Sequence, residues 1–199
     1  MSVFHRETSS QLVGLTGTLN AGKDTAANHL VNNHGFMHVS SGDVLRAEAK
    51  RQGLPNDRNT LIEIGVRLRK EYGNVGALVI KGVEQWQEQK EAYLGGLVVS
   101  GLRILGEAQE VHAQGGKLVF IDAPVEERYR RMVARQRDAE AEKTLEEFME
   151  HERYELEGLG GSDRPHLRAI QAISDIRLDN SGLPELFIAS LDESLGLAD

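Results

Sequence analysis

A glycine-rich segment between Gly17 and Thr25 restricts the fold of this chain more than any other feature. It reads Gly-Thr-Leu-Asn-Ala-Gly-Lys-Asp-Thr and lies between the apolar run Gln11–Thr16 and a stretch with the apolar spacing of a helix. A Gly-x-x-x-x-Gly-Lys pattern in this position lets backbone N–H groups converge on an anion at the helix N-terminus, where the dipole favours negative charge. We predict that the loop binds a nucleoside triphosphate and that Lys23 reaches its β- and γ-phosphates. The predicted contacts are Gly17, Leu19, Asn20, Ala21, Gly22, Lys23, Asp24 and Thr25.

The loop departs from the commonest version of this pattern at one position. The residue after the lysine is usually Ser or Thr, but here it is Asp24, and Thr25 follows it. Thr25 then becomes the hydroxyl on the phosphate side, while Asp24 also suits the first turn of a helix as an acidic residue. A Rossmann fingerprint is not matched, which disfavours a nicotinamide cofactor. The alternative for the whole segment is a glycine-rich turn without a ligand.

Five short apolar runs rich in Val and Ile alternate with helical patterns along the chain. Such runs are typical of strands that helices cover on both faces. The alternation predicts an α/β fold of three layers, with a doubly wound, parallel, five-stranded sheet in the middle. The predicted strands are 11–16, 36–40, 94–100, 117–122 and 175–178.

Two regions interrupt this alternation. The stretch 43–89 contains two or three successive helical patterns without a strand, and the stretch 136–168 is highly charged and contains Gly158, Gly160 and Gly161. Regions of this kind hold the moving parts of such folds. With 199 residues, we predict one domain with a core of 11–40, 92–135 and 169–199, a helical acceptor-binding insertion at 41–91 and a lid at 136–168.

Composition excludes several classes of function. The sequence has no cysteine, which removes disulfides and thiolate chemistry, and its net charge of -8 disfavours broad binding to nucleic acid. No apolar stretch approaches the roughly 20 residues that span a bilayer, and the opening MSVFHRETSS has no secretory signal. We therefore expect a cytoplasmic protein without nucleic-acid or membrane partners.

The segment after the second predicted strand reads Ser40-Ser-Gly-Asp-Val-Leu-Arg-Ala-Glu48. It closely resembles the Ser-Gly-Asp-x-Leu-Arg segment of adenylate kinases. The resemblance implies that Ser41 and Arg46 face an acceptor nucleotide and that Arg46 holds its phosphate. A guanidinium suits this role independently, because it can donate two parallel charge-assisted hydrogen bonds to a phosphate.

Asp43, within this segment, admits two interpretations. It can cap the helix that begins there. Alternatively it acts on the acceptor, as a general base or through magnesium, as the aspartate ending the equivalent strand does in dephospho-coenzyme A kinases. We place Asp43 among the candidate catalytic, acceptor-binding and metal-binding residues, with Thr25 as the second candidate metal ligand.

Further arginines resemble acceptor-binding residues of related kinases. The segment Arg58–Arg69 is similar to the acceptor region of phage-type deoxynucleotide kinases, which implies that Arg67 and Arg69 face the acceptor; the alternative is solvated arginines on an amphipathic helix. Arg103 falls where adenylate kinases place the arginine of Asp-Gly-Phe-Pro-Arg, which implies a second phosphate clamp with a catalytic role. Ser100 replaces the acidic residue that helps to hold magnesium there, so Asp24, Asp43, Asp122 or a water on Ser100 would have to substitute.

The helical pattern after Pro124 has an apolar face of Tyr129, Met132, Val133 and Gln136. Arg131 and Arg135 lie one turn apart on it, at the spacing of an arginine pair in adenylate kinases. This resemblance implies that one packs against adenine and the other touches the transferred phosphates. Arg128 and Arg130, which alternate with glutamates, are expected to be solvated.

Two shorter resemblances complete the predicted site. Gln136-Arg137-Asp138 is similar to a segment of dephospho-coenzyme A kinases, and Arg153 is a further candidate lid arginine. Asn180 and Gly182 match the Asn-x-Gly loop that borders the adenine in these kinases, although the same residues also suit a simple turn.

Together these features resemble the P-loop nucleoside and nucleotide kinase superfamily. They imply transfer of the γ-phosphoryl group of ATP, with Mg²⁺, to a nucleoside monophosphate or deoxynucleotide-like small molecule, by a monomer or homodimer. One alternative is a kinase of hydroxyl acceptors, such as dephospho-coenzyme A kinase. Another is a nucleotide-dependent regulator, although the Asn-Lys-x-Asp signature of a GTPase is absent from the sequence.

Overall fold

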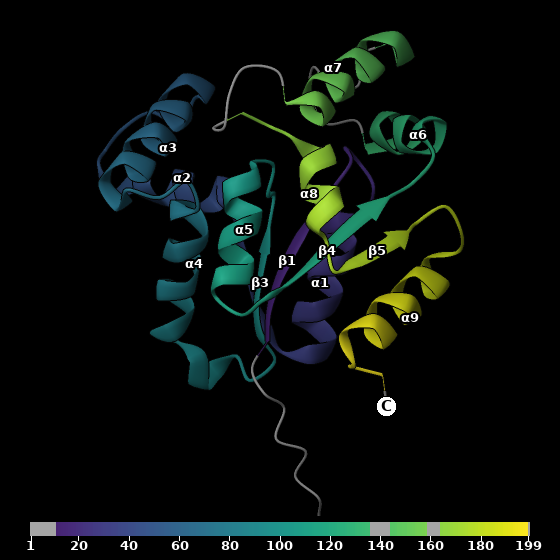
Figure 1. Ribbon diagram of the computed structural model, residues 1–199, viewed down its shortest axis with the longest axis horizontal. Helices are drawn as coiled ribbons and strands as arrows, with labels where there is room; N and C mark the ends of the chain where they lie inside the picture. The colour runs from purple at the N-terminus through teal and green to yellow at the C-terminus, as the bar shows by residue number, and fades with distance from the viewer. Residues whose placement is uncertain (1–10, 136–143, 159–163, 199) are drawn as a thin grey trace, which may run out of the picture.

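The computed structural model describes residues 11–135, 144–158 and 164–198 and contains a sheet of five parallel strands. The strand order is β2-β3-β1-β4-β5, so β1 lies in the centre of the sheet. Helices cover both faces (Figure 1), which confirms the predicted doubly wound α/β fold. The strands are β1 (Gln11–Gly17), β2 (Phe36–Ser40), β3 (Gly96–Ser100), β4 (Lys117–Asp122) and β5 (Ile176–Asp179).

Strand β3 begins later than the sequence predicts. Leu94 was expected in the strand, but it is 69% exposed, and the Gly96 N–H closes a turn onto the carbonyl of Tyr93. Gly96 has a φ of 122°, and a Cβ there would lie 2.0 Å from the Gln11 carbonyl oxygen. A glycine is therefore required where the chain turns into the sheet.

Two hydrophobic cores lie on opposite faces of the sheet. On one face, α1 (Lys23–His34) and α9 (Pro184–Leu195) pack with side chains such as Leu30 and Phe187 against Val13 and Val98. The other face is covered by α4 (Ala77–Gln87), α5 (Leu105–Ala113) and α8 (Leu167–Ile173). Burial of both sheet faces explains why the strand sequences are continuously apolar.

Two connections between strands of the sheet contain more than one helix (Figure 1). Between β2 and β3, the chain forms α2 (Ser41–Arg51), α3 (Arg58–Tyr72), α4 and a 3₁₀ turn at Lys90–Ala92. After β4 come α6 (Val125–Arg135) and α7 (Leu145–Glu157), which Figure 1 shows beyond the carboxyl ends of the strands. Among the described residues, no helix is long and apolar enough to cross a membrane.

Candidate active site

The glycine-rich loop connects the central strand β1 directly to α1. Gly17 has a φ of 135°, and a Cβ on it would lie 1.9 Å from the carbonyl oxygen of Ile121. Gly22 has a φ of 108°, and its Cβ would lie 2.2 Å from Nδ2 of Asn180. Both positions therefore require glycine, because a side chain would collide and the backbone is left-handed. Asn20 has a positive φ as well, 58°.

Lys23 is the first residue of α1, and its side chain folds back over this loop. Its Nζ donates hydrogen bonds to the carbonyls of Gly17, at 3.0 Å, and Thr18, at 2.6 Å. Burial, together with the nearby positive charge of Arg103, lowers the pKa of Lys23 to about 8. The negative charge of a bound phosphate would oppose this lowering of the pKa, because it favours the charged form of the ammonium group.

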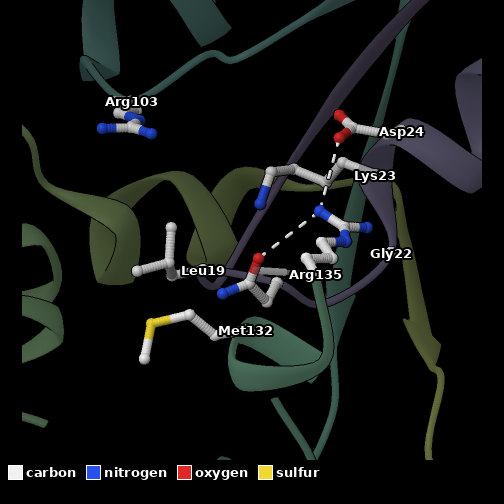
Figure 2. Close-up of a pocket in the computed structure, with 8 residues that line it drawn as sticks. Leu19, Gly22, Lys23, Asp24, Arg103, Met132 and Arg135 are labelled. Carbon is white, nitrogen blue, oxygen red and sulfur yellow. Dashed lines mark hydrogen bonds and ion pairs between the residues drawn. The ribbon is translucent and has the colours of Figure 1, made fainter. Parts of the chain in front are cut away.

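A cavity of about 220 Å³ lies over the loop (Figure 2). Arg135 reaches it from the end of α6, with its Nη1 atom 3.5 Å from Oδ1 of Asn20 and 3.6 Å from Oδ2 of Asp24. Arg103 reaches it from the segment after β3. Three cationic side chains from separate elements thus surround one hollow. The lining residues are Leu19, Asn20, Gly22, Lys23, Asp24, Arg103, Met132 and Arg135.

Residues at the carboxyl ends of β4 and β5 form hydrogen bonds with the loop. Thr18 Oγ1 donates to Oδ1 of Asp122 at 2.5 Å. The side chain of Asn180, which is 7% exposed, donates to the carbonyl of Ala21 at 2.8 Å. Its backbone N–H donates to the Asp122 carbonyl, also at 2.8 Å. Asn180 is therefore brought to the loop, whereas Gly182 lies further along in an exposed turn.

Arg131 lies beside Asn180 rather than in the cavity. Its Nη2 donates to the carbonyl of Asn180 and to Oε1 of Glu127, both at 2.6 Å. Its Nη1 is buried and has no hydrogen-bond partner among the described residues. The pair Arg131 and Arg135 therefore divides, with one arginine at the β5–α9 loop and the other over the glycine-rich loop.

Arg128 corrects a prediction, because it is buried rather than solvated. Only 4% of the residue is exposed, and it forms an ion pair with Glu152 of α7, with Nη2 3.0 Å from Oε2. Its Nε donates to the carbonyl of Ala123 at 2.6 Å, and its Nη1 lies 3.3 Å from the carbonyl of Leu19. Arg130 is solvated as predicted, with 78% of its side chain exposed.

The buried face of α6 also differs from the predicted one. Arg128 and Met132 are the buried residues of this helix, while Val133 is 41% exposed. The difference arises because α7 supplies a carboxylate that makes burial of Arg128 possible. The expected fourth member of the face, Gln136, lies with Arg137 and Asp138 outside the described residues.

Helix α7 contributes two carboxylates that the sequence interpretation did not include. Glu152 pairs with Arg128, and Glu155, which is 5% exposed, pairs with Arg103 at 2.6 Å. With the buried Phe148, these residues follow the i, i+4, i+7 spacing of one helix face, a signal that the sequence contained. Arg153 instead lines a separate surface hollow with Val125 and Met149.

At the end of β2, Asp43 does not cap α2 as one interpretation predicted. The N-cap is Ser40, whose hydroxyl oxygen accepts from the Asp43 N–H at 3.0 Å. The Asp43 carboxylate accepts from the Ser40 hydroxyl, at 2.5 Å, and from Arg46 Nη2, at 2.6 Å. Partial burial alone would raise the pKa of Asp43, but these hydrogen bonds from Ser40 and Arg46 hold it below its usual range.

The neighbouring Ser41 forms a hydrogen bond with the segment that follows β3. It is 9% exposed, and its hydroxyl donates to the carbonyl of Gly101 at 2.9 Å. This bond joins the start of α2 to the segment that carries Arg103. Ser41 thereby links the two predicted acceptor-binding segments, while Arg46 remains half exposed beside Asp43.

The two arginines of α3 lie in ion pairs away from the cavity. Arg69 contacts the buried Glu107, with Nη2 3.1 Å from Oε1. Burial raises the pKa of Glu107 although the Arg69 charge opposes this shift. Arg67 donates to Oε1 of Gln52 at 2.7 Å and lies 3.5 Å from Glu71. Neither arginine is among the residues that line the cavity.

The two candidate metal ligands lie on different helices, α1 and α2. Thr25 is exposed in the first turn of α1, and Asp43 is paired with Arg46 at the end of β2. Ser100 is 5% exposed, and its Oγ lies 2.8 Å from Nε2 of His38. Three acidic side chains lie near the loop: Asp24 lines the cavity, Asp122 accepts from Thr18, and Glu155 acts on the charge of Lys23.

The fold is that of P-loop kinases. Shikimate kinase from Bacteroides thetaiotaomicron superposes with a TM-score of 0.53 at 18% identity, over 94% of this chain and 99% of that one. A gluconokinase from Sinorhizobium meliloti gives a TM-score of 0.52 at 15% identity, over 96% and 94% of the two chains. At such identities the likeness is one of fold.

Sequence comparisons identify the family. A UPF0200 protein from Pyrococcus furiosus is 34% identical over 151 residues, which are 73% of this chain and 79% of that protein. A UPF0200 protein from Methanoregula boonei is 30% identical over 187 residues, 92% of this chain and 94% of that protein. The family model described as an AAA domain matches residues 16–148, from the end of β1 into α7. This chain therefore belongs to the AAA domain family and is a member of the UPF0200 proteins.

Proposed function

We propose that this protein transfers the γ-phosphoryl group of ATP to a small molecule. The observation that carries the proposal is the cavity over the loop, in which Lys23, Arg103 and Arg135 approach one space from three elements. Phosphoryl transfer spreads negative charge over the oxygens of the transferred group, and fixed cations stabilise that charge. A loop that only joined β1 to α1 would not need this set of cations.

The residues present suit a triphosphate. Gly17 and Gly22 adopt left-handed backbone conformations packed against Ile121 and Asn180, which only glycine permits and which form the tight turns of an anion-binding loop. The buried Nη1 of Arg131, which has no hydrogen-bond partner in the described part of the chain, offers a donor beside the Asn180 loop, where a nucleoside would extend from the phosphates. Magnesium, when bound, would neutralise phosphate charge. The candidate oxygen ligands are Asp24 and Asp122 near the loop, with Thr25 and Asp43 as further candidates.

Two half-exposed arginines favour an acceptor that carries a phosphate. Arg46 and Arg103 each have 48% of the side chain exposed, and each is paired with a carboxylate, Asp43 or Glu155. A phosphate can replace either carboxylate, because it can accept two parallel hydrogen bonds from a guanidinium and carries more charge. This supports a nucleoside monophosphate or deoxynucleotide-like acceptor, which Arg46 would hold while Arg103 bridges toward the transferred group.

A hydroxyl acceptor is the second candidate, and Asp43 is the observation that favours it. Its carboxylate lies in the first turn of α2, directly after β2, and 59% of the side chain is exposed to a second substrate. An ionised carboxylate can accept the proton of a hydroxyl group. Two solved structures with the same fold are a shikimate kinase and a gluconokinase.

A panel of acceptors with labelled ATP distinguishes these candidates. The panel contains nucleoside monophosphates, deoxynucleotides, dephospho-coenzyme A and unphosphorylated metabolites, and each reaction is followed by transfer of label. We expect label on a nucleotide phosphate. Label on a hydroxyl group alone would replace the first candidate with the second. If no acceptor receives label but a protein partner binds only the ATP-loaded form, the protein is a nucleotide-dependent regulator.

A further inference from the structure

A cluster of two histidines and one aspartate joins α1 to α9 on the side of the fold away from the cavity. His29 Nε2 lies 2.9 and 3.0 Å from the two carboxylate oxygens of Asp192 and 3.2 Å from Nε2 of His34. His34 Nε2 lies 3.0 Å from the same Asp192 oxygen, Oδ1. Each of the three side chains is between 15% and 19% exposed. Three potential ligand atoms therefore converge at a partly buried place.

We propose that His29, His34 and Asp192 form a binding site for a divalent transition-metal ion of the zinc type. In a tetrahedral site with metal–ligand bonds of about 2.0–2.1 Å, neighbouring ligand atoms lie about 3.3–3.4 Å apart. The separations in the cluster, 2.9 to 3.2 Å, are only slightly shorter. A cation between these atoms needs only small outward movements of the three side chains.

Hydrogen bonding alone accounts poorly for the arrangement. Each neutral imidazole nitrogen is either a donor or an acceptor. If both Nε2 atoms carry protons, both can donate to Asp192, but the two N–H groups then crowd one another, with their nitrogens 3.2 Å apart. If one lacks its proton, its lone pair lies close to the negative carboxylate. A cation satisfies all three groups together, because each presents a lone pair to it.

The position in the fold also favours a cation. His34 is the last residue of α1, and Asp192 lies in the last turn of α9. The carboxyl ends of helices carry partial negative charge, so two helix dipoles add to the charge of Asp192. Imidazole ligands select zinc, copper or nickel over magnesium, which prefers oxygen ligands. The site is thus chemically distinct from any magnesium bound with ATP.

The site is also separate from the cavity over the loop. Lys23 begins α1 and His34 ends it, so the full length of the helix, about 16 Å, lies between them. A metal ion here would join the carboxyl ends of α1 and α9 across one face of the sheet. Its binding does not depend on the proposed kinase activity.

Calorimetric titration of the full chain, purified without a histidine tag and dialysed against a chelator, tests the proposal. We expect one zinc ion per chain, a higher Tm with zinc, no competition from magnesium, and unchanged zinc binding in Lys23→Ala. His34→Gln and Asp192→Asn should each lower zinc affinity by at least about 100-fold, the upper end of the loss from removing an outer-shell partner. Titration with cobalt should produce visible absorption bands in the wild type but not in His34→Gln.

A matched control comes from another histidine. His112 Nε2 lies 2.9 Å from Asp175 in a single His–Asp pair, so His112→Gln should bind zinc as the wild type does. Circular dichroism of each variant establishes that it is folded. The proposal is overturned if the wild type takes up no stoichiometric zinc. It is equally overturned if folded His34→Gln and Asp192→Asn bind zinc with wild-type affinity, since the cluster is then only a hydrogen-bonded contact.

Discussion

Lys23 is buried beside Arg103, so its positive charge is unfavourable in the free protein and would be stabilised by a bound phosphate. In the free protein it bonds to two backbone carbonyls of its own loop, and burial lowers its pKa to about 8. A bound triphosphate raises this pKa, because phosphate oxygens favour the charged form. Binding and protonation of Lys23 are therefore linked.

This linkage predicts how affinity for ATP depends on pH. Below about pH 8, Lys23 is protonated in both the free and the ATP-bound protein, so it contributes no pH dependence to binding. Above about pH 8, the free protein must take up a proton when ATP binds. The affinity for ATP therefore falls by up to about tenfold per pH unit. Calorimetry between about pH 7 and pH 10 measures this, and Lys23→Arg, whose side chain stays charged, should show no such fall. A wild-type affinity that is constant over this range would contradict the account.

Arg46 is expected to act on the acceptor rather than on ATP. Arg46→Ala removes a charge-assisted contact worth about 2 kcal/mol, so we expect the acceptor KM to rise roughly 10- to 100-fold while KM for ATP changes little. Arg51→Ala on the same helix is the control, because Arg51 pairs with Glu48 and has 70% of its side chain exposed. An Arg46→Ala enzyme with wild-type KM and kcat for the acceptor would refute the role.

At the scale of elements, α6 and α7 are joined by a buried ion pair beside the loop. Arg128 and Glu152 are 4% and 8% exposed, and Arg128 also contacts the carbonyls of Ala123 and Leu19. The pair therefore connects α7, the end of β4 and the glycine-rich loop. Through this pair, α7 contacts the backbone of the loop that is proposed to hold phosphates.

Removing one partner of this pair should destabilise the fold. Glu152→Ala leaves the buried guanidinium of Arg128 with only the more distant Asp122, 3.7 Å from its Nε, and we expect the free energy of unfolding to fall by about 3 kcal/mol, the lower end for a broken buried pair. Denaturant unfolding measures the loss, with the solvated Arg130→Ala as a control that should change stability by less than about 0.5 kcal/mol. A Glu152→Ala protein as stable as Arg130→Ala would show that the buried pair does not support α7.

The elements themselves were largely predictable, and the spacing on α7 marks one face of that helix, but which arginine pairs with which carboxylate was not predictable. The five strands and the loop carry local signals, namely runs of Val and Ile and the glycine spacing, so sequence alone places them. The partners of Arg103 and Arg128 lie 52 and 24 residues away, on α7. Burial of Arg128 and the pairing of Arg69 with Glu107 depend on tertiary packing that periodicity does not encode.

At the scale of the molecule, the central place of β1 decides where the site lies. Its neighbours β3 and β4 end beside the loop, so Arg103 and Asp122 arrive from the two sides. Helices α2 to α4 follow β2 at one side, and α6 and α7 follow β4 (Figure 1). In the proposed kinase reaction, this arrangement would let an acceptor and a nucleotide approach the same cavity from different directions.

Closure around bound ligands should be visible across the molecule. We expect a non-hydrolysable ATP analogue to slow amide hydrogen exchange in the loop, α6 and α7, because the cations that meet the phosphates are connected to these elements. Exchange in the buried strand β3 should change little. Equal protection of α7 with and without the analogue would show that this helix does not respond to nucleotide.

The most direct test follows the γ-phosphoryl group itself. ATP labelled with ¹⁸O in its γ-phosphate is incubated with the acceptor found in the panel, and the product is analysed by mass spectrometry for the wild type and for Lys23→Ala. The account predicts an acceptor that carries the labelled phosphoryl group in the wild-type reaction and almost none with folded Lys23→Ala. Equal labelling by the two proteins would contradict the assignment of phosphoryl transfer to the loop between Gly17 and Thr25.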